Sequence, residues 1–262
     1  MSVNTHLTNL SSKLVLSSSE KSSISTSIST LRYRLNDYFE DSIISQEQFG
    51  SSTRGTILPR KADKNSDIDY MVEFDISNGK MKPQTYIDRL KRFAESKYSR
   101  SEIHQSHPTI ILQLNHIHFE LVPAIKEFYN LQIPSPSSSW QEWISTNPSE
   151  INKRLTDKNI QNNYHIKPLV RLVKFWNAKN GYHFRSFELE EYIIRSSFLY
   201  CTALKDYFYK FWRNFSCSYD TPQYVKDKVE RAKKYADKAR ELEDTGWPIS
   251  AESEIKKIVP DL

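Results

Sequence analysis

The stretch that decides the fold is FGSSTRGTILPRKADKNSDIDYMVEF, residues 49–74. It begins with a small, flexible step at Gly50 and Ser51, continues through a basic loop, and ends in an apolar run that carries Asp67 and Asp69. On a β-strand, residues two apart point to the same side, so the two carboxylates would project together and repel each other. A divalent cation relieves this repulsion, and Mg²⁺ takes carboxylate and phosphate oxygens as ligands. The stretch therefore predicts a strand that holds a metal ion beside a phosphate group.

The composition indicates a globular protein and excludes several classes. The chain has 262 residues, 38% of them hydrophobic and 13% aromatic, which is enough for a packed core. Neither GxGxxG nor GxxxxGK(S/T) occurs, so a Rossmann fingerprint and a P-loop are absent. The net charge of +5 suits a polyanionic substrate but also many soluble proteins. Cys201 and Cys217 lack zinc spacing, and no signal peptide or membrane span is predicted, so we expect a cytoplasmic protein with no membrane partner.

The first half of the chain predicts an α+β unit. Residues 1–16 are expected to be a flexible N-terminus. A long helix follows, because Ser17 and Glu20 form a capping-box pattern ahead of apolar residues at helical spacing. The patterns then predict strands at 43–49 and 67–74, a helix that Pro83 opens, and a β-hairpin from 109–114 and 117–122. This unit is expected to span residues 17–133.

The second half predicts helices. Pro134 and Pro136, with the serines around them, indicate a linker, and residues 134–262 are expected to form a helical domain. Its helices are expected around 169–176, from about 186 to 215, and from 223 to 244. The last of these mixes charge signs, which favours a solvated face over a dedicated RNA track. A cleft between the two halves is the place where we expect a ligand.

A third carboxylate lies in another apolar strand, HFELVPAI, residues 118–125. Burying Glu120 unpaired would be costly, so a nearby metal ion would explain this acid together with Asp67 and Asp69. The alternation of the strand equally allows an outward-facing Glu120. Its combination with the Gly-Ser step and the acid pair favours a shared metal site.

These motifs resemble the polymerase-β nucleotidyltransferase superfamily. The run LVRLVKFWNAKNGYHFRSFELE, residues 169–190, is similar to the helical half of the bacterial cyclic-oligonucleotide synthases called CD-NTases, relatives of cyclic GMP-AMP synthase and oligoadenylate synthase whose domain is often called SMODS. The resemblance covers residues 17–200. It implies an α+β fold with a polymerase-β-like mixed-sheet core, a C-terminal helical bundle and an active site in the cleft between them.

The resemblance also implies an activity. An enzyme of this kind joins nucleoside triphosphates (ATP and GTP, or pyrimidine nucleotides) into a cyclic di- or oligonucleotide and releases pyrophosphate. Two Mg²⁺ ions, replaceable by Mn²⁺, are the implied cofactors. The implied setting is bacterial antiviral (CBASS) signalling, in which the second messenger reaches an effector protein. Two alternatives stay open: transfer of a nucleotide to RNA, tRNA, a protein or a small molecule, and a catalytically silent nucleotide-binding module. RNA binding stays open as well.

The same resemblance assigns roles to eight residues. They hold the triphosphate (Gly50, Ser51), bind metal (Asp67, Asp69, Glu120), contact the β- and γ-phosphates (Lys174, Ser186) and face a base (Phe187). The family usually has Asp as the third acid, so the longer Glu120 would ligate metal directly or through water. The residues alone also allow a solvated Lys174 and a Ser186 that only caps its helix.

Four further polar residues flank these motifs. Arg54 and Arg60 precede the acid pair and could contact phosphates, but we interpret them as solvated. His116 and His118 flank the predicted hairpin turn without a partner at metal-ligand spacing, and we interpret them as surface residues.

Overall fold

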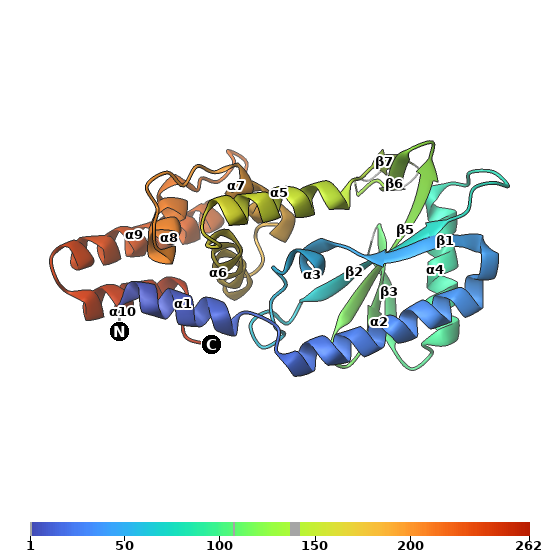
Figure 1. The fold of residues 1–262 in the computed structure, drawn as a ribbon, viewed down its shortest axis with the longest axis horizontal. Coiled ribbons are helices and arrows are strands. Elements are labelled where there is room, and N and C mark those ends of the chain that lie inside the picture. The colour runs from blue at the N-terminus through green and yellow to red at the C-terminus, as the bar shows by residue number, and fades with distance from the viewer. Residues whose placement is uncertain (1, 107, 137–141) are drawn as a thin grey trace. The chain divides into compact units, whose positions relative to one another are not determined.

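The computed structural model describes residues 2–106, 108–136 and 142–262 (Figure 1). The chain divides into two compact units. The sheet unit contains residues 17–60 and 65–152, and the helical unit contains residues 1–16, 61–64 and 153–262. Among the described helices, none combines the length and the apolar composition needed to cross a bilayer.

The sheet unit is built on a mixed sheet in which five strands follow the order β1-β2-β5-β4-β3, while β6 and β7 extend from β5. The strands are β1 Ile43–Gln48, β2 Asp67–Phe74, β3 Glu102–Ser106, β4 Thr109–Gln113, β5 His118–Glu127, β6 Asn130–Pro134 and β7 Trp143–Ser145. β2 and β5 pair in parallel, and the other pairs are antiparallel. The predicted strands at β1 and β2 and the hairpin of β4 and β5 are confirmed. Pro134 ends β6, and Ser135 and Pro136 follow it, whereas residues 137–141, which include the other serines of the predicted linker, lie outside the described residues.

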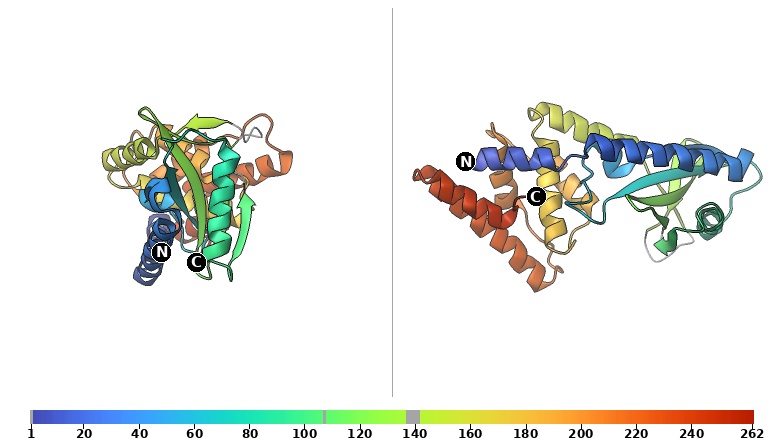
Figure 2. Two further views of the ribbon diagram at one scale, coloured as in Figure 1. Left: turned by 90° about the vertical axis from the view of Figure 1, so that its right-hand side faces the viewer. Right: turned by 90° about the horizontal axis from the view of Figure 1, so that it is seen from below.

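Two helices cover one face of this sheet. They are α2, Ser18–Phe39, and α4, Pro83–Lys97. The ring of Phe74 on β2 lies 5.2 Å from Phe39 of α2 and 5.0 Å from Tyr86 of α4, measured between centroids. Both helices therefore pack on the face to which Phe74 points (Figures 1 and 2). Because side chains alternate along a strand, Asp67 and Asp69 point to the opposite face. The 3-10 turn η1, Glu40–Ser42, and the short helix α3, Gly50–Arg54, lie at either end of β1.

The helical unit surrounds an aromatic core. Its helices are α1 Val3–Lys13, α6 Ile166–Lys179, α7 Ser186–Arg195, α8 Leu204–Asn214, α9 Gln223–Asp244 and α10 Pro248–Ile258, and α5, Pro148–Gln161, begins in the sheet unit. Trp212 is fully buried and meets the ring of Trp176 edge-on at 4.8 Å. Residues 223–244 form a helix as predicted.

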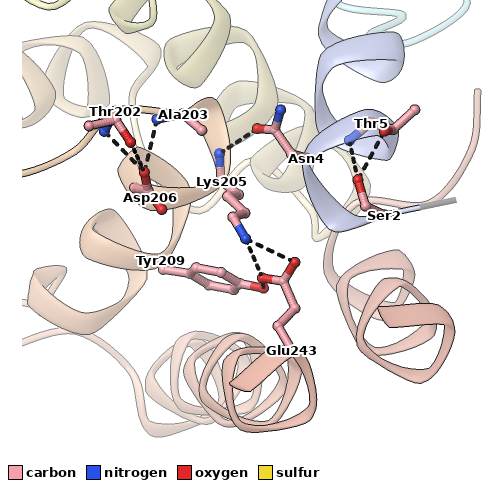
Figure 3. A network of polar contacts seen from close by, with 9 residues as sticks. All are labelled: Ser2, Asn4, Thr5, Thr202, Ala203, Lys205, Asp206, Tyr209 and Glu243. Carbon is pink, nitrogen blue, oxygen red and sulfur yellow. Dashed lines mark hydrogen bonds and ion pairs between the residues drawn. The ribbon is translucent and has the colours of Figure 1, made fainter. Parts of the chain in front are cut away.

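The N-terminus differs from the flexible segment that the sequence predicts. Val3 and Leu7 of α1 are fully buried, because α1 packs on α6, α8 and α10. The side-chain oxygen of Asn4 accepts a hydrogen bond of 3.2 Å from the backbone of Lys205, whose ammonium bonds in turn to Glu243 of α9 (Figure 3). The apolar pattern of α1 runs over only 11 residues, which is too short to predict a docked helix from the sequence. Contacts with α6, α8 and α10, which follow much later in the chain, hold α1 in place.

The single helix predicted from 186 to 215 is instead two helices, α7 and α8. Residues 196–203 separate them. The carboxylate of Asp206 accepts hydrogen bonds from the backbone N–H groups of Thr202 and Ala203, at 3.0 and 2.8 Å, and so starts α8 (Figure 3). Tyr200, with a φ of 65°, turns the chain just before it. The apolar residues continue across the break, so their spacing alone did not reveal it.

Candidate active site

The three predicted acids lie side by side on one face of the sheet. Asp67 and Asp69 open β2, and the parallel register places Asp69 directly opposite Glu120 of β5. Residues opposite each other on paired strands point to the same face, so all three carboxylates face away from α2 and α4. The prediction that they share one side of the sheet is confirmed. Glu120 does point away from the buried Phe119 and Leu121, as the outward-facing alternative required, and that outward face is the one that carries Asp67 and Asp69.

The electrostatics of this cluster are dominated by crowded negative charge. Burial, followed by the charges of Asp67 and Asp69 and a hydrogen bond with Asp67, raises the pKa of Glu120 from 4.5 to about 8. At neutral pH the protonated Glu120 therefore shares a hydrogen bond with the Asp67 carboxylate. The proton occupies the place where a cation would offset the charge.

The donor set suits a divalent cation. Three carboxylates from two neighbouring strands supply the oxygen ligands that Mg²⁺ prefers, and their mutual repulsion is the energy that a cation would relieve. Within the described part of the chain, no three His, Cys, Asp or Glu side chains are already drawn into ligand geometry. A bound cation would favour the ionised form of Glu120 and so compete with the proton that the metal-free cluster retains.

Gly50 lies against the acid pair. Its φ is +72°, and a Cβ built on it would come within 1.7 Å of Oδ2 of Asp69. The preceding residue holds the strand in register, since the N–H of Phe49 donates a 3.1 Å hydrogen bond to the carbonyl of Asp69. Ser51 is 9% exposed, and its carbonyl accepts the N–H groups of Thr56 and Ile57. The Gly50-Ser51 step thus lies directly beside the acid cluster, as its position in the sequence suggested.

Of the two arginines before the acid pair, Arg54 is buried, contrary to our interpretation, and Arg60 is only partly exposed. Arg54 is only 7% exposed. The Nη1 atom of Arg60 is buried, and the described residues offer it no hydrogen-bond partner. Arg54 and Arg60 belong to the sheet unit, whereas residues 61–64 of the same loop belong to the helical unit. The mixed polarity of the loop does not reveal this burial in its sequence.

The two histidines differ. His116 bonds through Nε2 to Ser27 at 3.0 Å on the surface, as expected. His118 is partly buried and stands opposite Asp67 in the register. Burial and then the charge of Arg60 lower the pKa of His118. His118 is therefore less exposed than the surface residue we expected, because pairing with β2 places it at the edge of the acid cluster.

The remaining predicted residues belong to the helical unit. Lys174 on α6 is 5% exposed, and its ammonium lies 3.5 Å from the fully buried Glu190 of α7, so the alternative of a solvated lysine is wrong. Ser186 is the first residue of α7, and Arg185 precedes it as the N-cap without a side-chain hydrogen bond. Phe187 is 53% exposed and lines a cavity of about 650 Å³ between α7 and α8. Sequence reasoning missed Glu190, because its partner is sixteen residues away on another helix.

Comparison with known proteins places this geometry in a family. The family model described as Second Messenger Oligonucleotide or Dinucleotide Synthetase domain (SMODS) matches residues 1–159. A probable cyclic nucleotide synthase of Bacillus cereus is 25% identical over 157 residues, which are 53% of this chain and 46% of that protein. The chain thus spans about half the length of this curated relative.

Solved structures share the fold over nearly the whole chain. Escherichia coli CdnC with ATP is 14% identical, covers 100% of this chain and 98% of its own, and has a TM-score of 0.72. Vibrio cholerae DncV cyclic AMP-GMP synthase with the linear intermediate pppA(3′,5′)pG is 14% identical, with coverages of 94% and 92% and a TM-score of 0.77. Bradyrhizobium diazoefficiens CdnG, a CD-NTase in complex with GTP, is 11% identical, with both coverages 98% and a TM-score of 0.72. The architecture is therefore the polymerase-β-like one of the CD-NTases, and the chain belongs to the Second Messenger Oligonucleotide or Dinucleotide Synthetase family.

Proposed function

We propose that this protein is a nucleotidyltransferase that joins nucleoside triphosphates into a cyclic di- or oligonucleotide and releases pyrophosphate. One observation carries the proposal: Asp67, Asp69 and Glu120 share one face of the sheet, with Asp69 and Glu120 directly opposite each other. Family membership supports the same reaction, and three of the similar proteins were solved with ATP, GTP or a linear dinucleotide. By the resemblance, the product would serve antiviral signalling of the CBASS kind through an effector protein.

The chemical step is attack by a ribose hydroxyl on the α-phosphorus of a bound triphosphate. The new O–P bond forms as the bond to the β-phosphate bridging oxygen breaks, and pyrophosphate leaves. Asp67 and Asp69 would hold Mg²⁺, or Mn²⁺ in its place, and the ions would lower the pKa of the attacking hydroxyl and offset charge on the phosphates. Glu120, once deprotonated, would complete the ligand set and accept the proton of the hydroxyl. A second round on the linear product would close the ring.

The remaining residues would bind the nucleotide. We assign Gly50 and Ser51 to the triphosphate, because the absence of a side chain at Gly50 lets backbone approach the acid pair. Lys174 and Ser186 are assigned to the β- and γ-phosphates, and Phe187 to a base. Lys174 would have to exchange its contact with Glu190 for phosphate, so its replacement should raise the KM for the triphosphate.

The test is incubation of the protein with four labelled triphosphates and Mg²⁺, followed by phosphatase treatment and mass spectrometry. We expect a phosphatase-resistant product and one pyrophosphate for each bond formed. Asp67→Asn should abolish both the product and the release of pyrophosphate. The control is Asp75→Asn, which should leave both unchanged, because the Asp75 carboxylate lies just beyond the far end of β2 and bonds to Ser77. Label that appears instead in added RNA or protein would identify a different acceptor. The absence of any turnover with Mg²⁺ and Mn²⁺ would overturn the proposal.

A further inference from the structure

A cationic pocket lies in the helical unit, and none of the residues assigned above lines it. It has a volume of about 240 Å³ and is bounded by the end of α6, one face of α9 and the end of α10. Its lining residues are Trp176, Asn180, Lys228, Arg231, Tyr235 and Lys257, with Ala232 and Ile258. Three cations thus line it, and no acidic side chain does so among the described residues.

Lys228 is held in place by the turn that follows α6. Its ammonium donates to the carbonyl of Asn180 at 2.6 Å and lies 3.0 Å from Nε2 of His183. Burial and then the charge of Lys228 lower the pKa of His183, which favours the neutral ring that can accept a hydrogen bond from the ammonium at Nε2. An ammonium has three donors, and the third remains for another acceptor.

Gly181, in the turn after α6, lies close to both His183 and Lys228. Gly181 has a φ of +102°, and a Cβ there would lie 3.3 Å from Nε2 of His183 and 3.9 Å from the ammonium of Lys228. Glycine therefore allows the backbone to approach the pair closely. The position of the charge is fixed before any ligand arrives, which lowers the entropic cost of binding.

The other two cations converge on the same space. Arg231 follows Lys228 by three residues and so shares its face of α9. Lys257 comes from α10, with its ammonium 5.1 Å from the centroid of the Tyr235 ring and 2.6 Å from the carboxylate of Glu254, which lies outside the lining. A C-terminal cap on α6 would explain Lys228 alone, but it gives no reason for Arg231 and Lys257 to gather beside it.

We propose that this pocket binds a small phosphate-bearing anion, such as pyrophosphate or a phosphomonoester. Three cations line one small pocket, and an anion with several oxygens can accept charge-assisted hydrogen bonds from all of them. The volume is below the roughly 300–1,000 Å³ of pockets for drug-sized ligands, which favours a compact anion over a whole nucleoside triphosphate. The site is independent of the proposed catalytic reaction.

Titration calorimetry with inorganic pyrophosphate tests this site. The protein carries Asp67→Asn and Asp69→Asn and is kept free of divalent metal, so that the acid cluster takes no part. We expect saturable binding of one pyrophosphate per chain, weakened at least about tenfold by Arg231→Gln with Lys257→Gln, since each removes a charge-assisted hydrogen bond. Both residues are exposed, and unchanged thermal unfolding of the variant verifies its fold.

The matched control is Lys233→Gln with Lys238→Gln. It removes the same net charge from the protein, at two lysines of α9 that bond to Glu230 and Glu241 and do not line the pocket. The control should bind pyrophosphate as the parent does. No saturable binding, or equal weakening by the two pairs of substitutions, would overturn the proposal and leave the catalytic reaction unaffected.

Discussion

Replacing Gly50 by alanine should disable the acid cluster while leaving the fold intact. A Cβ at this position would lie 1.7 Å from Oδ2 and 2.5 Å from Cγ of Asp69, whereas ordinary contact begins at 3.4 Å. The carboxylate would have to retreat by about 1.7 Å. Since a misplacement of about 1 Å can cost about 100-fold in rate, we expect turnover of triphosphates to fall at least that far. The left-handed backbone, with a φ of +72°, adds about 1–2 kcal/mol of strain.

Gly55→Ala separates the two effects. Gly55 has almost the same backbone, with a φ of +71°, but no described atom lies within 4 Å of the added Cβ. It should therefore lose similar stability in thermal unfolding and keep most of its turnover. Pyrophosphate release measured at several Mg²⁺ concentrations compares the variants. If Gly50→Ala turned over within a few-fold of Gly55→Ala, the contact with Asp69 would not control the geometry of the acids.

Three further predictions concern stability. Without metal, the free energy of unfolding should fall as pH rises from about 4.5 to 8, because the folded protein retains the proton of Glu120 and the unfolded chain does not. Urea titrations at several pH values measure this slope, and Glu120→Gln should flatten it. Lys174→Met should lower the free energy of unfolding by about 3 kcal/mol, because the fully buried Glu190 loses the ammonium beside it. Lys179→Met, at an exposed position of the same helix, should lower it little, and urea titration compares the two variants. Leu7→Ala should cost about 3 kcal/mol in thermal unfolding, because it empties a buried site under α1. Unchanged stability in Lys174→Met or Leu7→Ala, or an unchanged pH slope in Glu120→Gln, would contradict the contact that the variant tests.

The parts of the fold that the sequence predicted are those whose pattern is local. Ser17 and Glu20 make the predicted capping box at the start of α2, and Pro83 opens α4. The missed elements lack such patterns. β3, with the sequence EIHQS, has only Ile103 as an apolar residue, and its pairing with β4 alone makes it a strand. α1 likewise depends on helices made much later in the chain.

The sequence predicted that the three acids share a face, but not which residues of β2 and β5 lie opposite each other. Alternation along β2 and β5 places the acids on one face if the strands are neighbours, and their apolar runs favour that. The parallel pairing that sets Asp69 against Glu120 joins strands about fifty residues apart, and packing fixes it rather than any local signal. The same limit explains Lys174 and Glu190, whose contact depends on how α6 and α7 meet.

The attachment of α1 has a consequence for synthesis on the ribosome. Nε2–H of His6 donates to the carbonyl of Val259 at 2.9 Å, so α1 completes its binding surface only when the segment around residue 259 has been translated. The strands can pair in the meantime, since they need only residues up to 145. Until then the apolar stripe of Val3, Leu7 and Leu10 lacks the part of its cover that α10 supplies and stays partly open to nascent-chain chaperones. A bulky tag fused ahead of Ser2 would obstruct this late docking step.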